Sequence, residues 1–259
     1  MRGNTWKCGK NAQLELNIKD KVIAYAIKTK AMLTPEEYLQ HVKTIFQAAG
    51  DPGRAQGQMA YMRNQFEFYG LKAPEWAALS KQIFINKGIP QGAELKTLAR
   101  LCMDDEYREL NYFALEMIQK VQKKQPEEFI MFFEELITTR SWWDTVDWLA
   151  KLVGIHFRRF PQLIGPVTER WMASGNMWLQ RVCLIFQLPY KEKTDAELLF
   201  GYILELKDSK AFFIQKGAGW ALRQYSKTDP EAVVAFIEAH PQLAPLTKRE
   251  GMKWINKKN

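Results

Sequence analysis

The fold is decided by two related stretches, Trp178-Leu179-Gln180-Arg181-Val182-Cys183 and Phe213-Ile214-Gln215-Lys216-Gly217-Ala218, which lie 35 residues apart. The same alignment gives a faint repeat with steps of 34, 35, 35 and 34 residues through Asn111, Thr145, Gln180, Gln215 and Arg249. A period of this length is typical of a two-helix repeat. Such units bury their apolar faces only by stacking. The sequence therefore predicts an all-α solenoid whose inner helices line a concave surface.

Helix-start signals dominate the rest of the chain, and strand signals are scarce. Thr34-Pro35-Glu36-Glu37 is a capping box with proline at the first helical position, so a helix should begin there. Further helices are predicted to start ahead of apolar periodic runs at Pro74, Pro126, Pro161, Thr194-Asp195 and Asp229-Pro230. Short connections between ten or more such helices favour hairpins stacked in chain order.

Residues 1–31 fit this plan poorly, because they contain neither a clear cap nor a long helical period. We expect them to be an N-terminal extension that is disordered, strapped onto the fold, or the product of a start codon assigned too early. A targeting role is a less favoured alternative. Residues 32–259 are expected to form the repeat domain.

Composition limits the class of protein. Of the 259 residues 47% are hydrophobic and 25% charged, which is typical of a globular chain, and no apolar run reaches the length of about 18 residues that a bilayer requires. No secretory signal is recognisable, so we expect a cytoplasmic protein without membrane contact. The residues that most often bind metals are isolated from one another: Cys8, Cys102, Cys183, His41, His156 and His240. We therefore expect no metal site, no cofactor and no Cys-His nucleophile pair.

The net charge of +8 is unevenly distributed. Residues 1–31 carry +5, residues 32–139 carry −3 and residues 140–259 carry +6. The basic character thus belongs to the extension and to the C-terminal half. A phosphate-bearing partner of the C-terminal half is expected, although a high isoelectric point alone is weak support.

The segment Ser141-Trp142-Trp143-Asp144-Thr145-Val146-Asp147 brings an aromatic residue and a carboxylate together. On a helical period the core stripe is expected to contain Trp142, Val146, Leu149, Ala150 and Val153, while Trp143 and Asp147 share the strip beside it. An acid next to an indole suits recognition of a cation, or stabilisation of a transition state that becomes cationic. The alternative is that Trp143 packs in the ordinary way and Asp147 is a solvated helix charge.

Arg181 is the only charge in the run Met177–Phe186, which is apolar nearly all round and therefore typical of a buried inner helix. A guanidinium in such a place needs an anionic partner, because leaving it unpaired is costly. Two partners remain open: a bound phosphate, or an internal ion pair with Asp147 one repeat earlier.

The next inner helix, Phe212–Arg223, contains two glycines, Gly217 and Gly219, each of which costs roughly 1 kcal/mol against alanine in a helix interior. A close backbone approach should therefore occur there. Lys216, Trp220 and Arg223 share one face, and an aromatic between two cations suits a sugar-phosphate backbone. The alternative is that Trp220 belongs to the core and the cations extend from it to solvent.

Four motifs in this order and spacing resemble the AlkD-like family of HEAT-repeat DNA glycosylases, which remove alkylated purines: Ser141–Asp147, Trp178–Arg181, Phe212–Arg223 and Pro245-Leu246-Thr247-Lys248-Arg249-Glu250. The earlier segments Met59-Ala60-Tyr61-Met62-Arg63-Asn64 and Gly70-Leu71-Lys72-Ala73-Pro74-Glu75 belong to the same likeness. It runs from about Met32 to the C-terminus and has no counterpart in residues 1–31.

The resemblance implies roles for individual residues. The family's catalytic aspartate corresponds to Asp147, and its two site tryptophans correspond to Trp143 and Trp220. Arg181 matches an arginine that contacts the DNA backbone near the lesion, and Tyr61 and Arg223 match positions flanking that groove. Further phosphate contacts are expected from Lys216, Lys248 and Arg249.

The function that the resemblance implies is monofunctional excision of cationic N3- and N7-alkylated purines from duplex DNA, as the first step of base excision repair, without flipping the base. The protein is expected to act as a monomer and to associate with the nucleoid when on DNA. A non-catalytic helical-repeat scaffold that binds DNA or another protein is the alternative. A scaffold that binds DNA leaves Asp147 without a role. A scaffold that binds protein leaves the cluster of cations on the inner helices without one.

Overall fold

A computed structural model describes residues 33–258. This part of the chain is helical and contains no strand, which confirms the all-α prediction. The capping box is formed as predicted: Thr34 accepts a hydrogen bond from the backbone of Glu37, whose side chain accepts one from the backbone of Thr34. The predictions for residues 1–31 and for Cys8 lie outside the described residues.

The chain divides into two compact units, with the boundary between Val121 and Gln122. The described helices of the first unit are α2 (Pro35–Ala49), α3 (Pro52–Tyr61), α4 (Ala73–Lys87), α5 (Gly92–Asp104) and α6 (Arg108–Val121). Helix α2 packs against α4 and α5, and α6 packs against the same two helices, so these four form the body of the unit.

The second unit contains the 3₁₀ turns η1 (Gln122–Lys124), η2 (Pro161–Leu163) and η3 (Lys191–Lys193). Its α-helices are α7 (Phe129–Thr138), α8 (Trp143–Arg159), α9 (Ile164–Ala173), α10 (Met177–Ile185), α11 (Ala196–Glu205), α12 (Phe212–Tyr225), α13 (Pro230–Ala239), α14 (Pro245–Met252) and α15 (Ile255–Lys258).

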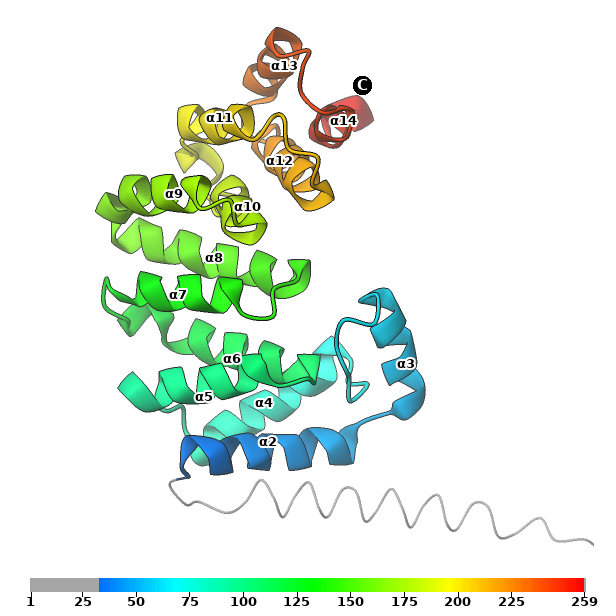
Figure 1. Ribbon diagram of the computed structural model, residues 1–259, viewed down its shortest axis with the longest axis vertical. Coiled ribbons are helices and arrows are strands. Elements are labelled where there is room, and N and C mark those ends of the chain that lie inside the picture. The colour runs from blue at the N-terminus through cyan, green and yellow to red at the C-terminus, as the bar shows by residue number, and fades with distance from the viewer. Residues whose placement is uncertain (1–32, 259) are drawn as a thin grey trace, which may run out of the picture. The chain divides into compact units, whose positions relative to one another are not determined.

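The helices of the second unit form hairpins that stack in chain order, as in a helical-repeat solenoid (Figure 1). The pairs α7 and α8, α9 and α10, and α13 and α14 are in contact, as are α12 and α13. The second helices of successive hairpins also pack on one another, α8 on α10, α10 on α12, and α12 on α14. The repeat alignment falls on this row, with Thr145, Gln180, Gln215 and Arg249 in its four successive helices. We call α8, α10, α12 and α14 the inner row.

Burial explains why the inner row holds together. In α8, the predicted stripe Val146, Leu149, Ala150 and Val153 is at most 1% exposed. In α10 every residue from Arg181 to Ile185 is buried, as the apolar run predicted. Trp142 differs from the prediction, because it is the N-cap of α8 and only half-buried.

Proline marks helix starts with varying accuracy. Helices α4 and α13 begin at or next to Pro74 and Pro230, and Asp195 caps α11. After Pro126 the chain makes a turn before α7 begins at Phe129, and Pro161 opens the turn η2 rather than α9 itself. The first turn of a helix tolerates proline, but so do other turns, so the residue alone does not fix the boundary.

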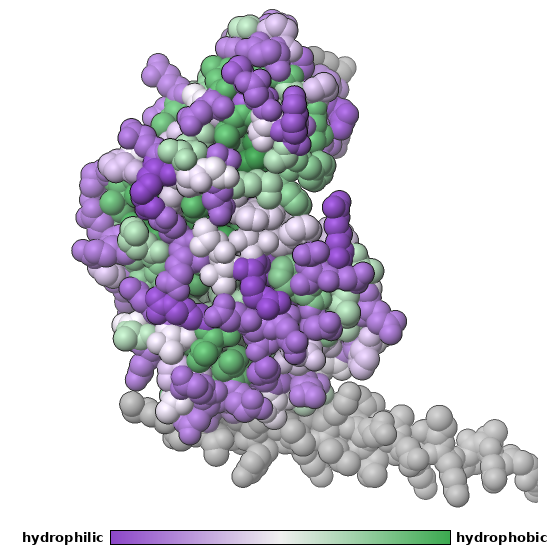
Figure 2. All heavy atoms as spheres, viewed as in Figure 1, coloured by the Kyte–Doolittle hydropathy of each residue, from purple (hydrophilic) through white to green (hydrophobic). Residues whose placement is uncertain are grey.

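The visible surface is mostly hydrophilic, with hydrophobic residues in separate groups (Figure 2). Among the described helices, none is long and apolar enough to cross a membrane.

Candidate active site

Asp147 and Arg181 form a bidentate ion pair between the first two helices of the inner row. Nε of Arg181 donates to Oδ1 of Asp147 at 2.8 Å, and Nη2 donates to Oδ2 at 2.9 Å. The two residues are 34 positions apart, one repeat, so the internal pair that the sequence left open is present. The alternative of a solvated helix charge at Asp147 is wrong.

A third hydrogen bond anchors the arginine to the next helix. Nη1 of Arg181 donates to the backbone carbonyl of Phe213 in α12 at 2.6 Å. Gly217, one turn further along α12, leaves the space for the guanidinium, since a Cβ at this position would lie 3.0 Å from Nη1. The first of the two glycines is thus explained by the close approach of a side chain.

The pair is largely withdrawn from water but still reachable. The Arg181 side chain is 4% exposed and that of Asp147 17%. Burial raises the pKa of the Asp147 carboxyl above its ordinary value, and the hydrogen bonds and charge of Arg181 oppose this shift. Two carboxylate oxygens offer about four lone-pair positions, so the bidentate contact leaves acceptor capacity on both.

A cluster of three aromatic residues meets the pair through Phe213. The rings of Trp142, Trp178 and Phe213 contact one another, with centroids 5.0 to 6.0 Å apart. Phe213 also lies 5.9 Å from the Arg181 guanidinium carbon. Trp143, the first residue of α8, is half-buried and lies one turn before Asp147 on the same face. An indole and a carboxylate therefore share one exposed edge of α8.

A second charge cluster joins α12 to α14. The carboxylate of Glu250 accepts hydrogen bonds from Lys216 at 2.6 Å, Arg223 at 3.0 Å and Lys253 at 2.5 Å. The Glu250 side chain is only 3% exposed, while the three cations are 31% to 48% exposed. Three positive charges meet one negative charge, so the cluster carries an excess of positive charge at the surface. This Glu250 cluster can receive an anion.

The pKa of Glu250 is set by its partners. Burial favours the neutral acid, but hydrogen bonds and charges from Lys216 and Lys253 outweigh it and lower the pKa to about 2. The second glycine serves this contact, because a Cβ at Gly219 would lie 2.5 Å from Cβ of Glu250 and 2.9 Å from the Thr247 carbonyl oxygen. The close approach predicted from the two glycines is therefore confirmed at both positions.

The other predicted residues occupy separate places. Trp220 is half-buried on α12, one turn beyond Gly217. Lys248 donates to the Pro241 carbonyl at 2.8 Å, and Arg249 is exposed on α14. The structure thus pairs Asp147 with Arg181 directly, and brings Lys216 and Arg223 to the same carboxylate, that of Glu250.

Tyr61 belongs to the first unit and ends helix α3, with 71% of its surface exposed. It lines a groove of about 580 Å³ between α3, α4 and α6, together with Trp76 and Tyr112. The loop after it is fixed by Glu109, whose buried carboxylate accepts hydrogen bonds from the backbone N–H groups of Tyr69, Gly70 and Leu71.

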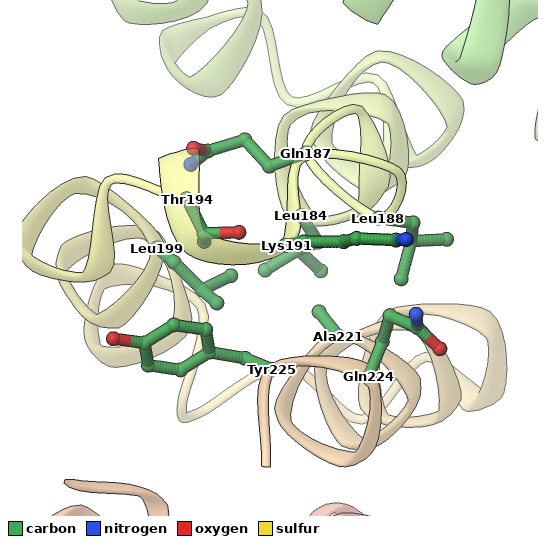
Figure 3. Close-up of a pocket in the computed structure, with 9 residues that line it drawn as sticks. All are labelled: Leu184, Gln187, Leu188, Lys191, Thr194, Leu199, Ala221, Gln224 and Tyr225. Carbon is green, nitrogen blue, oxygen red and sulfur yellow. The ribbon is translucent and has the colours of Figure 1, made fainter. Parts of the chain in front are cut away.

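The cavity shown in Figure 3 lies among α10, α11, α12 and η3 of the second unit, apart from the predicted site residues. Its volume of about 10 Å³ is close to that of one water molecule, so it cannot enclose a purine. The part of the chain that the structure describes contains no group of three metal-ligating side chains. Burial raises the pKa of the Cys102 and Cys183 thiols, which disfavours the nucleophilic thiolate.

Sequence reasoning missed Glu250 as a member of the site, although a signal was available. Arg181 pairs with an acid 34 residues before it, and Lys216, its equivalent in the next repeat, pairs with an acid 34 residues after it. A search for opposite charges one repeat apart finds both pairs. Periodicity places Trp142 in the core stripe, so the sequence does not predict its contacts with Trp178 and Phe213.

Comparisons with known proteins identify the family of the chain. Residues 42–255 match the family described as DNA alkylation repair enzyme. A solved structure of a predicted DNA alkylation repair enzyme from Enterococcus faecalis is similar, with 33% sequence identity and a TM-score of 0.75 over 80% of this chain and 97% of that chain. No curated protein matches. The match to the family covers most of the chain, including the whole inner row and both charge clusters, so the chain belongs to the family of DNA alkylation repair enzymes.

Proposed function

We propose that the protein is a monofunctional DNA glycosylase that excises cationic N3- and N7-alkylated purines from duplex DNA. The observation that carries the proposal is the Asp147 carboxylate, held by Arg181 and partly exposed at an edge of α8 beside Trp143. Membership of a DNA alkylation repair family supplies the substrate class. We further propose that it acts as a cytoplasmic monomer, on duplex DNA lying against the face that the inner row lines.

The chemistry suits a fixed carboxylate. A purine alkylated at N3 or N7 is already cationic and leaves without being protonated, so the demanding species is the oxocarbenium-like sugar. Asp147 stabilises this cation electrostatically, and its unused acceptor positions can orient or deprotonate the attacking water. Because the carboxylate is poorly hydrated, its interaction with a nearby cation is stronger than in bulk water.

Arg181 acts in this proposal chiefly as a positioning residue. Its three hydrogen bonds fix the carboxylate relative to α10 and α12, which satisfies the need for a preorganised charge. The contact of Arg181 with a DNA phosphate, which the resemblance implies, stays a prediction. Trp143 and Trp220 are proposed to hold the deoxyribose, and the Glu250 cluster with Tyr61, Lys248 and Arg249 to contact the backbone.

Strand cleavage is not expected after base release. A Schiff base requires an amine with a free lone pair, whereas the Lys216 ammonium donates a hydrogen bond to Glu250 at 2.6 Å. The product should therefore be an intact strand with an abasic site.

The proposal is tested by incubating the full chain with a duplex that contains one N7-methylated or N3-methylated purine, and measuring the released base by chromatography. Asp147→Asn should slow release by about 100-fold or more, while binding to undamaged duplex stays within a few-fold. Asp144→Asn is the matched control, because it removes the same charge three residues earlier on the same helix. Comparable release by the wild type and Asp147→Asn would exclude Asp147 from the mechanism.

Adduct size provides a second test, of the proposal that the lesion stays in the duplex. If no pocket closes around the base, a bulky cationic adduct should be released only modestly more slowly than a methyl adduct. Neutral adducts should be poor substrates at either size, because the leaving base lacks its positive charge. Strong rejection of bulky cationic lesions, or efficient release of neutral ones, would require a closed pocket that contains an acid.

A further inference from the structure

We propose that the second half of α8 carries an additional binding site for the phosphodiester backbone, apart from the residues assigned above. The site is a groove of about 660 Å³ lined by Lys123, Lys151, Ile155, Arg158, Arg159 and Pro189. Four of its six lining residues are cations and none is an acid. We call it the basic groove.

The basic groove continues the face of α8 on which Asp147 lies. On a helical period, Lys151 and Arg158 follow Asp147 at i+4 and i+11 and share its side of the helix. Eleven residues of α-helix span about 16 Å, which is the rise of about five base pairs along one strand. A strand that follows the axis of α8 from Asp147 therefore reaches the basic groove with phosphates about five base pairs from the lesion.

Among the described residues, no carboxylate forms an ion pair with the cations of the groove. Lys123 and Lys151 are exposed, and within residues 33–258 neither has an ion-pair or hydrogen-bond partner. Arg158 lies over the ring of Tyr190 at 4.6 Å, and Arg159 over that of Phe160 at 4.8 Å while Nη1 donates to the Gln122 carbonyl. This differs from the Glu250 cluster, where an acid occupies the centre.

A purely structural explanation covers only part of the arrangement. Arg158 and Arg159 lie in the last turn of α8, where cations interact favourably with the negative end of the helix dipole. Lys123 belongs to η1, and Lys151 lies about two turns before the helix end, beyond the range of that effect. Four like charges around one groove repel one another, and an anion in the groove would relieve this repulsion.

The kind of anion follows from the donors. Guanidinium groups held over aromatic rings suit bidentate contact with phosphate oxygens, and flexible lysines complete such a site as point charges. A groove open along its length accommodates a chain of phosphates. The choice of duplex DNA as the source of these phosphates rests on the proposed function.

The test measures binding of the full chain to an undamaged duplex of about 20 base pairs by fluorescence anisotropy at several salt concentrations. Each phosphate contact contributes about 0.9 to the slope of log affinity against log salt, so Lys123→Gln with Lys151→Gln should lower the slope by about 1.8 and weaken binding tens-fold at 0.1 M salt. The control, Lys193→Gln with Lys227→Gln, removes two exposed charges of the same unit that do not line the groove. It should leave the slope nearly unchanged.

Three results would overturn the inference. The first is an unchanged salt slope in the groove variant, and the second is an equal fall in the slope of the control. The third is a groove variant that keeps the duplex affinity of the wild type but loses binding to anionic lipid vesicles. An unchanged melting temperature, expected because both lysines lack partners, shows that a fall in affinity is not due to unfolding. The measurement uses undamaged DNA, so failure of the wild type to release bases would refute the proposed function without affecting this result.

Discussion

Replacing Arg181 with alanine should destabilise the protein mainly through the carboxylate that remains. The change removes both hydrogen bonds to Asp147 and the one to the Phe213 carbonyl. Breaking a fully buried pair costs about 3–5 kcal/mol, and since water reaches part of Asp147 we expect a loss of about 2–4 kcal/mol in the free energy of unfolding. Urea unfolding at pH 7 measures it.

A double-mutant cycle isolates the pair. Asp147→Asn, Arg181→Ala and the double variant should show a coupling of about 2 kcal/mol, within the range of residues in direct contact. The pH dependence gives a second measure. Burial already raises the pKa of Asp147, and removing the opposing Arg181 raises it further. A raised pKa favours the protonated acid in the folded state, and a protonated Asp147 no longer needs a cationic partner. The loss of unfolding free energy in Arg181→Ala should therefore shrink as pH falls from 7 through the pKa of Asp147.

The reasoning is refuted if the coupling is near zero, or if the deficit of Arg181→Ala stays constant as the pH is lowered from 7 through the titration of Asp147. DNA affinity per folded molecule then distinguishes the roles of Arg181. A salt slope lower by about 0.9 indicates a phosphate contact as well, while an unchanged slope leaves only the internal pair.

Four further variants test the packing of the helices, the Glu250 cluster and the contribution of residues 1–31. Gly219→Ala should lower stability by about 1–2 kcal/mol in thermal unfolding, because overpacking against α14 exceeds the gain in helix propensity, whereas Gly201→Ala, with open space around its Cβ, should raise it by up to about 1 kcal/mol. Glu250→Gln should lower the free energy of unfolding by about 1–2 kcal/mol at pH 7. Because the wild type's advantage depends on the depressed pKa of Glu250, it should disappear as pH falls from about 4.5 to about 2. A difference that stays constant over this range would contradict the role of the cluster. Deleting residues 1–31 should leave the melting temperature and base release nearly unchanged, since Thr34 caps the first described helix. An insoluble product would show that these residues are needed for folding.

Local signals in the sequence were sufficient for the helices and their repeat. The capping box at Thr34 and the apolar run around Arg181 depend on neighbours within one or two turns, so they are readable without tertiary information. The repeat period placed equivalent residues correctly on the inner row, because stacked hairpins preserve register from one repeat to the next.

The contents of the site were less predictable, because they depend on contacts between helices. The sequence left two partners open for Arg181, and only the register of α8 against α10 places two of its three guanidinium nitrogens, Nε and Nη2, on Asp147. Trp142 was assigned to the core by periodicity alone, although α8 begins one residue later. Gly219 signalled a close approach without identifying Glu250 as the residue approached.

The space at Gly217 provides a criterion for comparing relatives of this protein. Any side chain at this position forces the guanidinium of Arg181 to move by a few tenths of an ångström, and the carboxylate bound to it must follow. A homologue could therefore retain both the aspartate and the arginine and still hold its acid in a different place. Sorting such sequences by the acid alone would group together enzymes with different geometries, whereas the residue one turn after the Phe213 position separates them.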